Sequence, residues 1–277
     1  MPAAPDPPQP EVDDPPRNSS HPSAPWHGLG PLGRAAAPYL SAGVLVTSAT
    51  CELWRYRLST LLRGQSAQRA VRVLQRWSCR SWRWLRLDVR VHGTPSNTPR
   101  IYVSNHRSYL DIPVLSGVLG TSFMSRSDVA AWPLVGAAAK AVGTVFVNRE
   151  DPYARAHAAR RLMRHVGKLS VVVFPEGTTT RERFPGSFHP GFFDLARRFK
   201  TAIVPVTIRY GHRRAYWTDD ITLPHHLLTR VLTMPPVAVA VHIGRDVESR
   251  DFGDGETLAR AVHDAVCNPI AEFGELA

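Results

Sequence analysis

Short apolar runs rich in valine and isoleucine recur from residue 87 onward in this 277-residue chain, and they limit its fold more than any other feature. A run such as Val171-Val172-Val173-Phe174 has no polar face, which is typical of a strand buried on both sides in a parallel sheet. The runs predict strands at Leu87–His92, Arg100–Ser104, Ser122–Ser125, Gly143–Val147, Leu169–Phe174, Ala202–Ile208 and Val237–Ile243. Helical spacing predicts helices at 109–119, 128–141, 152–166, 191–199 and 255–272. This alternation predicts an α/β fold with a mostly parallel central sheet flanked by helices.

Three of the predicted strands are followed at once by polar residues. The polar segments are Asn105 to Asp111, Asn148 to Asp151 and Pro175 to Thr180. In open α/β sheets, ligands bind beyond the carboxyl ends of the strands. If the strands are parallel, the three segments share one edge of the sheet, and we expect the chemistry there.

His106 and Asp111 are the pair at this edge with the clearest chemical use. A chain that leaves a strand at His106 and turns into a helix permits the Asp111 carboxylate to meet one ring nitrogen. The carboxylate then fixes the tautomer, and the other nitrogen takes a proton from an attacking group, as a general base does. Taken alone, such a pair is more typical of a capping or packing role.

Four ordered blocks resemble those of the 1-acyl-glycerol-3-phosphate acyltransferase family, and they favour catalysis. The blocks are Asn105-His106-x4-Asp111, Gly143-Thr144-Val145-Phe146-Val147-Asn148-Arg149, Phe174-Pro175-Glu176-Gly177-Thr178 and Ile203-Val204-Pro205-Val206. The resemblance covers roughly residues 87–245, and four blocks in order are far more specific than one. It implies an O-acyltransferase that moves a fatty acyl group from acyl-CoA or acyl-carrier protein to a lysophospholipid. These two substrates react directly, without a cofactor or an acyl-enzyme.

The resemblance also implies a role for each matched residue. His106 is the base that deprotonates the acceptor hydroxyl, and Asp111 is its partner. Arg149 holds the acceptor phosphate, because the guanidinium fork matches phosphate oxygens in pairs. The other residues expected to bind substrate are Glu176, Gly177, Thr178 and Thr179 in the acceptor loop, Pro205 near the thioester, and Arg126.

Thr179 departs from the family pattern, which usually has an arginine there. A hydrogen bond to a charged group is worth about 1.5 to 3 kcal/mol, so the loss matters unless Arg126, Arg181 or Arg183 compensates. We expect 1-acyl-sn-glycerol-3-phosphate as the acceptor, giving phosphatidate. Another lysophospholipid or lyso-ornithine lipid is the close alternative, because relatives with Thr at this place act on such acceptors. A noncatalytic lipid-binding protein is the alternative from another class, and the intact His106 and Asp111 argue against it.

The chain before residue 87 has a different texture. Residues 1–33 hold ten of the 24 prolines and no secretory signal pattern, so we expect a disordered tail on a protein that stays in the cytoplasm. The uncharged run 35–51 reaches about 25 Å as a helix, short of the roughly 30 Å hydrocarbon core. A spanning helix is therefore marginal, and we expect residues 35–62 to dip into one leaflet.

An arginine stripe follows this run. Residues 55–90 hold ten arginines and a single acidic residue, Asp88, and with the adjacent Trp54 they account for four of the seven tryptophans. Seven of these arginines recur at steps of three or four, which stacks them on one helical face: Arg69, Arg72, Arg76, Arg80, Arg83, Arg86 and Arg90. A basic amphipathic helix with Trp at its boundary is typical of a membrane surface. A core helix with a solvated basic face is the alternative.

These patterns predict residues 34–86 as a membrane-associating segment and 87–277 as the acyltransferase domain. We expect a peripheral or monotopic enzyme on the anionic cytoplasmic face of the cell membrane. No nucleic-acid-binding motif accompanies the basic patch, so we do not expect nucleic acid as a partner. The three cysteines lie far apart, and the loop with Asp219-Asp220 and His225-His226 lacks metal-ligand spacing, so no metal site is expected.

Overall fold

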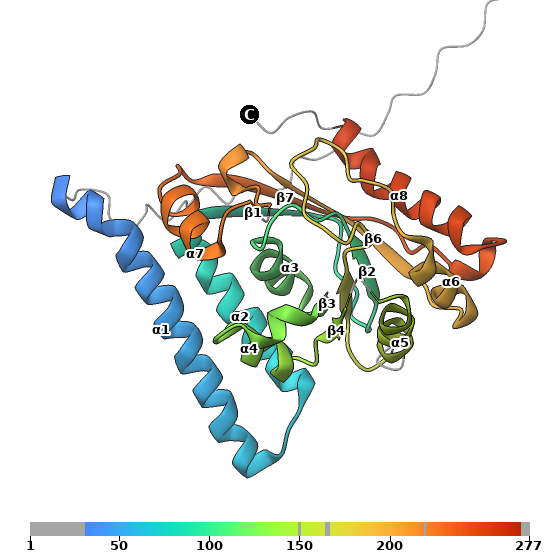
Figure 1. Cartoon of the computed structure of the whole chain (residues 1–277), viewed down its shortest axis with the longest axis horizontal. Coiled ribbons are helices and arrows are strands. Elements are labelled where there is room, and N and C mark those ends of the chain that lie inside the picture. Colours follow the sequence, from blue (N-terminus) through green and yellow to red (C-terminus); the bar gives the residue numbers. More distant parts are fainter. Residues whose placement is uncertain (1–30, 149–150, 164–166, 219, 273–277) are drawn as a thin grey trace, which may run out of the picture.

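The computed structural model of the chain describes residues 31–148, 151–163, 167–218 and 220–272. Seven strands form one sheet in the order β1-β7-β6-β2-β5-β3-β4 (Figure 1). Their bounds are β1 Leu87–His92, β2 Ile101–Ser104, β3 Ser122–Arg126, β4 Val145–Val147, β5 Val171–Val173, β6 Ile203–Tyr210 and β7 Val237–Ile243. All neighbouring strands are parallel except β6 and β7, which are antiparallel. The mostly parallel α/β sheet is therefore confirmed.

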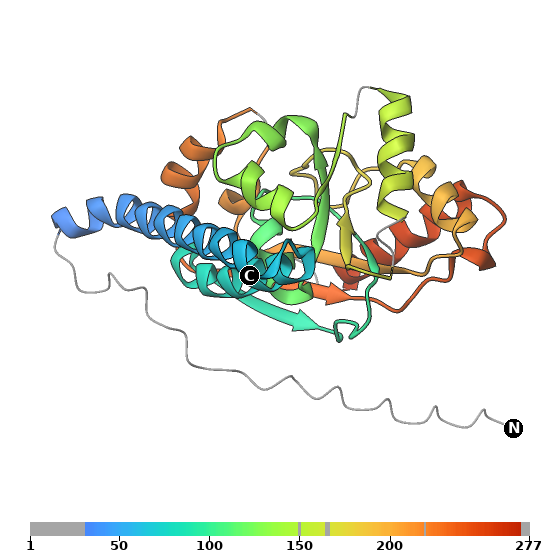
Figure 2. The ribbon, with the colours of Figure 1, turned by 90° about the horizontal axis from the view of Figure 1, so that it is seen from below.

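Helices cover both faces of this sheet (Figures 1 and 2). On one face lie α2 Ala67–Leu85, α3 Asp111–Leu119 and α7 Leu223–His226, and on the other lie α5 Pro152–Met163, α6 Pro190–Arg198 and α8 Gly255–Glu272. Successive strand residues point to opposite faces. Val204 and Val206 thus pack with α2 and α3, whereas Ile203 packs with α6 and α8. Burial on both faces explains why the strand sequences are continuously apolar.

The N-terminal helix α1, Pro31–Arg63, forms a hairpin with α2 (Figure 1). Trp77 Nε1 on α2 donates to Ser48 Oγ on α1 at 3.1 Å, and Arg80 pairs with Glu52 at 2.6 Å. The other side of α2 packs closely on α3, where the Trp82 ring occupies the space that a side chain at Gly117 would need. The helix α2 is therefore a layer of the α/β core, and α1 lies against its outer side, where Leu45 alone of the described α1 side chains is buried in the main apolar cluster.

The predicted helix 128–141 is wrong in its middle. The chain forms a short 3-10 turn at Ser127–Ala131, and α4 Val135–Ala141 begins only after Pro133. Proline lacks an N–H group and pushes the preceding residue out of the helical region. Trp132 accordingly has φ −68° and ψ 131°, which is extended backbone.

The arginine stripe is shorter than predicted. Arg86 ends α2 in the left-handed conformation, with φ 59°, and Arg90 belongs to β1, where it pairs with Ala240. The helix therefore carries five members of the stripe, which are Arg69, Arg72, Arg76, Arg80 and Arg83. Its opposite face is buried inside the protein, with Val71, Ser78, Ser81 and Leu85 among the buried residues, which matches the alternative of a core helix with a solvated basic face.

Other predictions meet the limits of the described residues. The expected disordered tail falls on residues 1–30, which lie outside them, while residues 31–33 already belong to α1. The last three residues of the predicted helix 152–166 also lie outside them. The polar loop expected around His225-His226 is instead α7, continued by a π-helical turn at Leu227–Val231.

Candidate active site

The carboxyl ends of five parallel strands bring the predicted polar segments to one edge of the sheet. The segment after β2 begins at Asn105, the segment after β5 begins at Phe174, and β6 ends beside them at Tyr210. On β3 and β4, Arg126 pairs with Val147, the residue before Asn148. The expected common edge is confirmed by this register.

His106 and Asp111, called the dyad below, meet at this edge. His106 Nδ1 lies 2.7 Å from Asp111 Oδ2, and the side chains are 15% and 0% exposed. Because a carboxylate only accepts, Nδ1 is the donor in this contact, and in the neutral imidazole Nε2 then holds the lone pair. None of the described residues hydrogen-bonds Nε2 in this arrangement. The ring therefore presents an unshared, oriented lone pair at the edge of the sheet.

Asp111 is held by four donors. Its Oδ2 also accepts the backbone N–H groups of Arg107 at 2.7 Å and Ser108 at 3.1 Å. Its Oδ1 accepts the Oη–H of Tyr210 at 2.7 Å. A carboxylate has about four lone-pair sites, so these donors saturate it. Asp111 is also the first residue of α3, where the helix dipole favours negative charge.

The segment after β5 holds His106 from two sides. Phe174 stacks on the imidazole with the ring centroids 4.0 Å apart. Glu176 Oε1 accepts the backbone N–H of His106 at 2.8 Å, and its Oε2 accepts that of Gly186 at 3.0 Å. Burial raises the pKa of Glu176, which these two amides partly offset. Glu176 thus ties both ends of the acceptor loop to the histidine.

Two further residues fix the segment that follows β2. The side-chain amide of Asn105 makes a paired bond with the backbone of Ile208, at 2.9 Å and 2.8 Å. Arg107 is only 2% exposed, and its guanidinium donates to the carbonyl oxygen of Arg183 at 2.8 Å. Its own carbonyl oxygen accepts the N–H of Trp217 at 3.0 Å. The segment is therefore joined to β6, to the acceptor loop and to the loop before α7.

The acceptor loop is more exposed than the histidine segment. Gly177 has φ +73°, a conformation that favours glycine, and the ring of His189 lies against it. Thr178 is exposed, and Thr179 is half-buried. Arg181 lies 3.2 Å from Asp220, and Arg183 lies over the Phe184 ring at 5.3 Å.

Arg126, Arg149 and Pro205 stand apart from this loop. Arg126 is half exposed at the end of β3 and pairs with Asp128 at 2.9 Å. Arg149 lies outside the described residues. Pro205 pairs with Val103 inside the sheet and borders a hollow beside α8, so it lies on the face opposite to Phe174 and His106. Strand alternation therefore turns Pro205 away from His106, and its expected place near the thioester stays a prediction.

The sequence analysis missed Tyr210, the clamp of Asn105 on Ile208 and the buried Arg107. Tyr210 was not recognised as a candidate because the strand is predicted to end at Ile208, two residues before the end of β6. One indication was available: a strand tyrosine next to the polar edge needs a partner for its hydroxyl once it is buried. Among the described residues, no group of three or more His, Cys, Asp or Glu side chains lies close enough to hold a metal ion.

Comparisons with known proteins bear on this geometry. A family model described as Acyltransferase matches residues 88–209. The lyso-ornithine lipid O-acyltransferase of Pseudomonas aeruginosa is 32% identical over 213 residues, which cover 74% of this chain and 80% of that protein. The chloroplastic 1-acyl-sn-glycerol-3-phosphate acyltransferase LPAT1 of Arabidopsis thaliana is 36% identical over 145 residues, and the match spans 51% of this chain and 40% of that protein. A crystal structure of the 1-acyl-sn-glycerophosphate acyltransferase of Thermotoga maritima shares the fold, with a TM-score of 0.64 and 24% identity over 87% of this chain and 95% of that one.

Proposed function

This chain belongs to the 1-acyl-glycerol-3-phosphate acyltransferase family, and from that premise we propose that it acylates the free hydroxyl of 1-acyl-sn-glycerol-3-phosphate to give phosphatidate. The observation that carries the proposal is the 2.7 Å contact of His106 Nδ1 with a buried, saturated Asp111. The acyl donor is acyl-CoA or acyl-carrier protein, since both present the same thioester. The step requires no cofactor.

The geometry supports a direct transfer. Nε2 of His106 takes the proton of the acceptor hydroxyl while the oxygen forms a bond to the thioester carbonyl carbon. The carbon–sulfur bond then breaks, and the thiolate takes the proton back from the imidazolium. Asp111 keeps the ring oriented and stabilises its transient positive charge. Because His106 is only 15% exposed and is stacked on Phe174, little water competes for the nitrogen.

Lyso-ornithine lipid is a second candidate acceptor, and a specific observation favours it. Thr179 replaces the usual arginine, while Arg126 and Arg181 are already paired with acidic side chains. The edge therefore has less free positive charge for a phosphate than the family pattern offers. The Pseudomonas aeruginosa relative that is named for this acceptor aligns with this chain over 80% of its own length.

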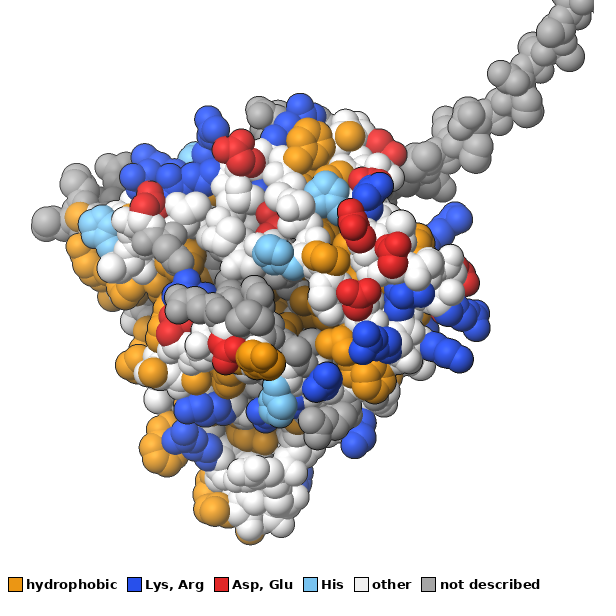
Figure 3. Space-filling view, turned by 45° about the vertical axis from the view of Figure 1, so that its right-hand side comes forward, with side chains coloured by type: hydrophobic (Ala, Val, Ile, Leu, Met, Phe, Trp, Pro, Cys, Tyr) orange, Lys and Arg blue, Asp and Glu red, His pale blue; other side chains and the backbone are white. Residues whose placement is uncertain are grey.

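We also place the reaction at an anionic membrane, with the hairpin of α1 and α2 against the lipid. The described residues include no helix with enough length and apolarity to cross a bilayer. Large apolar side chains of α1 are nonetheless exposed, with Trp54 at 64%, Leu61 at 79% and Leu62 at 85%. In the space-filling view, apolar side chains gather along the left and lower left of the molecule, where α1 lies, whereas basic side chains are spread over both sides (Figure 3). Apolar area in this amount beside arginines suits the headgroup region.

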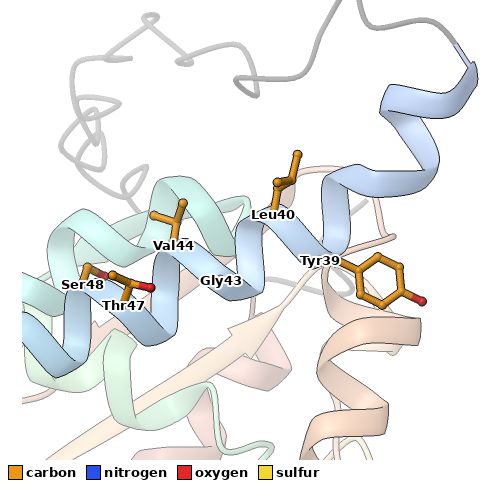
Figure 4. A pocket seen from close by; sticks show the side chains of 6 residues that line it. All are labelled: Tyr39, Leu40, Gly43, Val44, Thr47 and Ser48. Carbon is orange, nitrogen blue, oxygen red and sulfur yellow. The ribbon is translucent and has the colours of Figure 1, made fainter.

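The first half of α1 has the same character. Tyr39, Leu40 and Val44 project from it around a shallow hollow, whose other lining residues are Gly43, Thr47 and Ser48 (Figure 4). Tyr39 is 68% exposed. An aromatic ring with a hydroxyl is favoured at the level of the headgroups. A monotopic or peripheral position on the cytoplasmic face fits this distribution.

A thioester-release assay tests the function. Purified protein in anionic vesicles is offered acyl-CoA or acyl-carrier protein with a panel of acceptors: 1-acyl-sn-glycerol-3-phosphate, a lysophosphatidyl diester, lyso-ornithine lipid and a lysolipid without a free hydroxyl. We expect thiol release only with acceptors that carry the hydroxyl, and fastest with 1-acyl-sn-glycerol-3-phosphate. Faster release with lyso-ornithine lipid selects the second candidate. Lipid binding without thiol release from any acceptor contradicts an enzyme and supports a noncatalytic lipid-binding protein.

A further inference from the structure

The two oxygens of the Asp111 carboxylate have unequal surroundings. Oδ2 accepts from three donors, namely His106 Nδ1 and the backbone N–H groups of Arg107 and Ser108. Oδ1 accepts from the Oη–H of Tyr210 at 2.7 Å. A partial rotation of the carboxylate about its bond to Cβ would turn its plane, and thus the accepting oxygen, away from Nδ1 of His106. The Tyr210 hydroxyl opposes such rotation, because it is the donor that faces Oδ1.

The fold gives this tyrosine a fixed distance from the dyad. Asn105 clamps the backbone of Ile208 with two hydrogen bonds, and Tyr210 follows two residues later on the same face of β6. On its other side, β6 pairs with β7, so that Tyr210 lies opposite Val239. The segment that begins at Asn105 therefore holds both His106 and the strand end from which Tyr210 reaches Asp111.

Toward Asp111, the hydroxyl of Tyr210 acts as a hydrogen-bond donor. Its side chain is enclosed within the apolar cluster between the sheet and α3, and the residue is 4% exposed. Burial and the neighbouring Asp111 raise the pKa of Tyr210 well above its ordinary value. The proton thus stays on Oη throughout the pH range in which a phospholipid-modifying enzyme works. A buried hydroxyl next to a buried carboxylate has a strong preference for this bond.

We propose that Tyr210 is a positioning residue, whose Oη–H holds the Asp111 carboxylate so that Oδ2 faces Nδ1 of His106. The pair is thereby extended to a line of three side chains, Tyr210, Asp111 and His106, contributed by β6, α3 and the segment after β2. The role rests on the proposed function, because it matters only if His106 acts as the base. Tyr210 touches no reacting atom.

The test compares Tyr210→Phe with a matched control. Tyr102→Phe is the control, because Tyr102 is also a fully buried tyrosine of the sheet, with a hydroxyl that accepts from the N–H of Ser96 away from the dyad. We expect Tyr210→Phe to lower kcat by about tenfold to hundredfold while KM for both substrates stays unchanged. Tyr102→Phe should keep the wild-type kcat. Equal kcat in Tyr210→Phe and wild type would overturn the proposal.

A double-mutant cycle separates positioning from a general loss of structure. In the Asp111→Asn background, the added Tyr210→Phe change should lower kcat no further, because the group through which Tyr210 acts is already altered. If the two changes instead multiply, Tyr210 acts on something other than Asp111, and the assignment is wrong.

A measurement that needs no turnover separates the positioning role of Tyr210 from the proposed acyltransferase activity. In proton NMR, the Nδ1–H of His106, identified by its loss in His106→Ala, should move in Tyr210→Phe and stay in place in Tyr102→Phe. An unmoved resonance contradicts the positioning role even if the enzyme is active. A moved resonance in a protein that acylates no acceptor supports the geometry and contradicts the proposed function instead.

Discussion

The burial of side chains differs between the segment that carries His106 and the hairpin of α1 and α2. In the segment, the polar Asp111 is fully buried and saturated with donors. In the hairpin, most of the surface of the apolar Leu61 and Leu62 is exposed. A buried, satisfied network selects one geometry and needs nothing from outside. An exposed apolar helix surface is incomplete without a second phase to cover it. The contrast separates the part of the molecule suited to chemistry from the part suited to lipid.

The largest expected effect comes from substitutions in the segment that carries His106. His106→Ala should reduce acyl transfer by about 10² to 10⁴, because a positioned base contributes a factor of this size. Asp111→Asn should cost somewhat less, since the base remains but loses its orienting charge. Thioester release measures both, and the circular dichroism spectrum checks the fold.

His225→Ala is the matched control for this prediction. His225 is an exposed histidine on α7, and its loss should leave the rate unchanged. Wild-type acyl transfer by His106→Ala would remove the dyad from the mechanism, and the family membership would then describe the fold without the chemistry.

The contact between His106 and Asp111 was predictable because it depends on local sequence. The contact of Tyr210 with Asp111 was not predictable. His106 and Asp111 are five residues apart across a single strand-to-helix turn, so their meeting follows from the turn itself. Tyr210 lies 99 residues beyond Asp111, and only the order of strands in the sheet brings them together. The same holds for Asp220, whose pairing with Arg181 across 39 residues neutralises a charge that the sequence left free.

Helix boundaries show a similar division. The arginine periodicity continued through Arg86 and Arg90, but the burial of Leu87 and the register of β1 with β7 ended the helix at Leu85. Tertiary pairing thus overrode a helical pattern. The break at Pro133 was local and readable, since a proline inside a helical pattern marks its end.

The second prediction concerns the basic charge of the hairpin and leaves His106 and Asp111 unchanged. Replacement of Arg72, Arg76 and Arg83 by Gln removes three exposed charges from α2. Each basic residue near an anionic surface is worth about 1 kcal/mol, so liposome binding should weaken by about a hundredfold at low salt. Co-sedimentation with vesicles of varied anionic lipid content measures the change.

The control removes the same charge elsewhere, at Arg198, Arg250 and Arg260, and should leave binding almost unchanged. High salt should mimic the α2 variant only in part, because the apolar residues of α1 keep their own affinity for the bilayer. Binding that does not depend on lipid charge would show that the stripe faces water and that α1 alone, or no part of the hairpin, meets the membrane.

A third prediction concerns a pair of stacked histidines on β1 and β7. His92 and His242 stack with centroids 4.4 Å apart, toward the sheet edge opposite to the dyad. Burial first, then His92 and Arg209, lower the pKa of His242 to about 4, and Glu272 lines the same hollow. The unfolded chain, with an ordinary pKa near 6.5, therefore binds a proton that the native state does not.

Stability should accordingly fall as pH drops from about 6.5 to about 4, by at most about 3 kcal/mol from this group. His242→Phe keeps an aromatic ring against His92 and should flatten this part of the stability curve in urea unfolding. His225→Phe, at an exposed site, should retain the wild-type slope. An unchanged slope in His242→Phe would show that the buried imidazole does not set the acid sensitivity.

The smallest expected effect concerns the acceptor loop, which is intermediate between the two regions because its Arg181 is exposed but paired with Asp220. Thr179→Arg adds a free cation near Glu176 and should lower KM for 1-acyl-sn-glycerol-3-phosphate by about tenfold. A phosphomonoester carries roughly −1.5 to −2 charge near neutral pH, more than a diester, so a lysophosphatidyl diester should gain less. Arg149→Ala should do the reverse, since the guanidinium fork suits a terminal phosphate. The comparison requires both acceptors in the same vesicles, so that membrane binding is held constant. Equal shifts in KM for the two acceptors would mean that neither position recognises headgroup charge, and would leave acceptor choice to the lysolipid's orientation at the membrane surface.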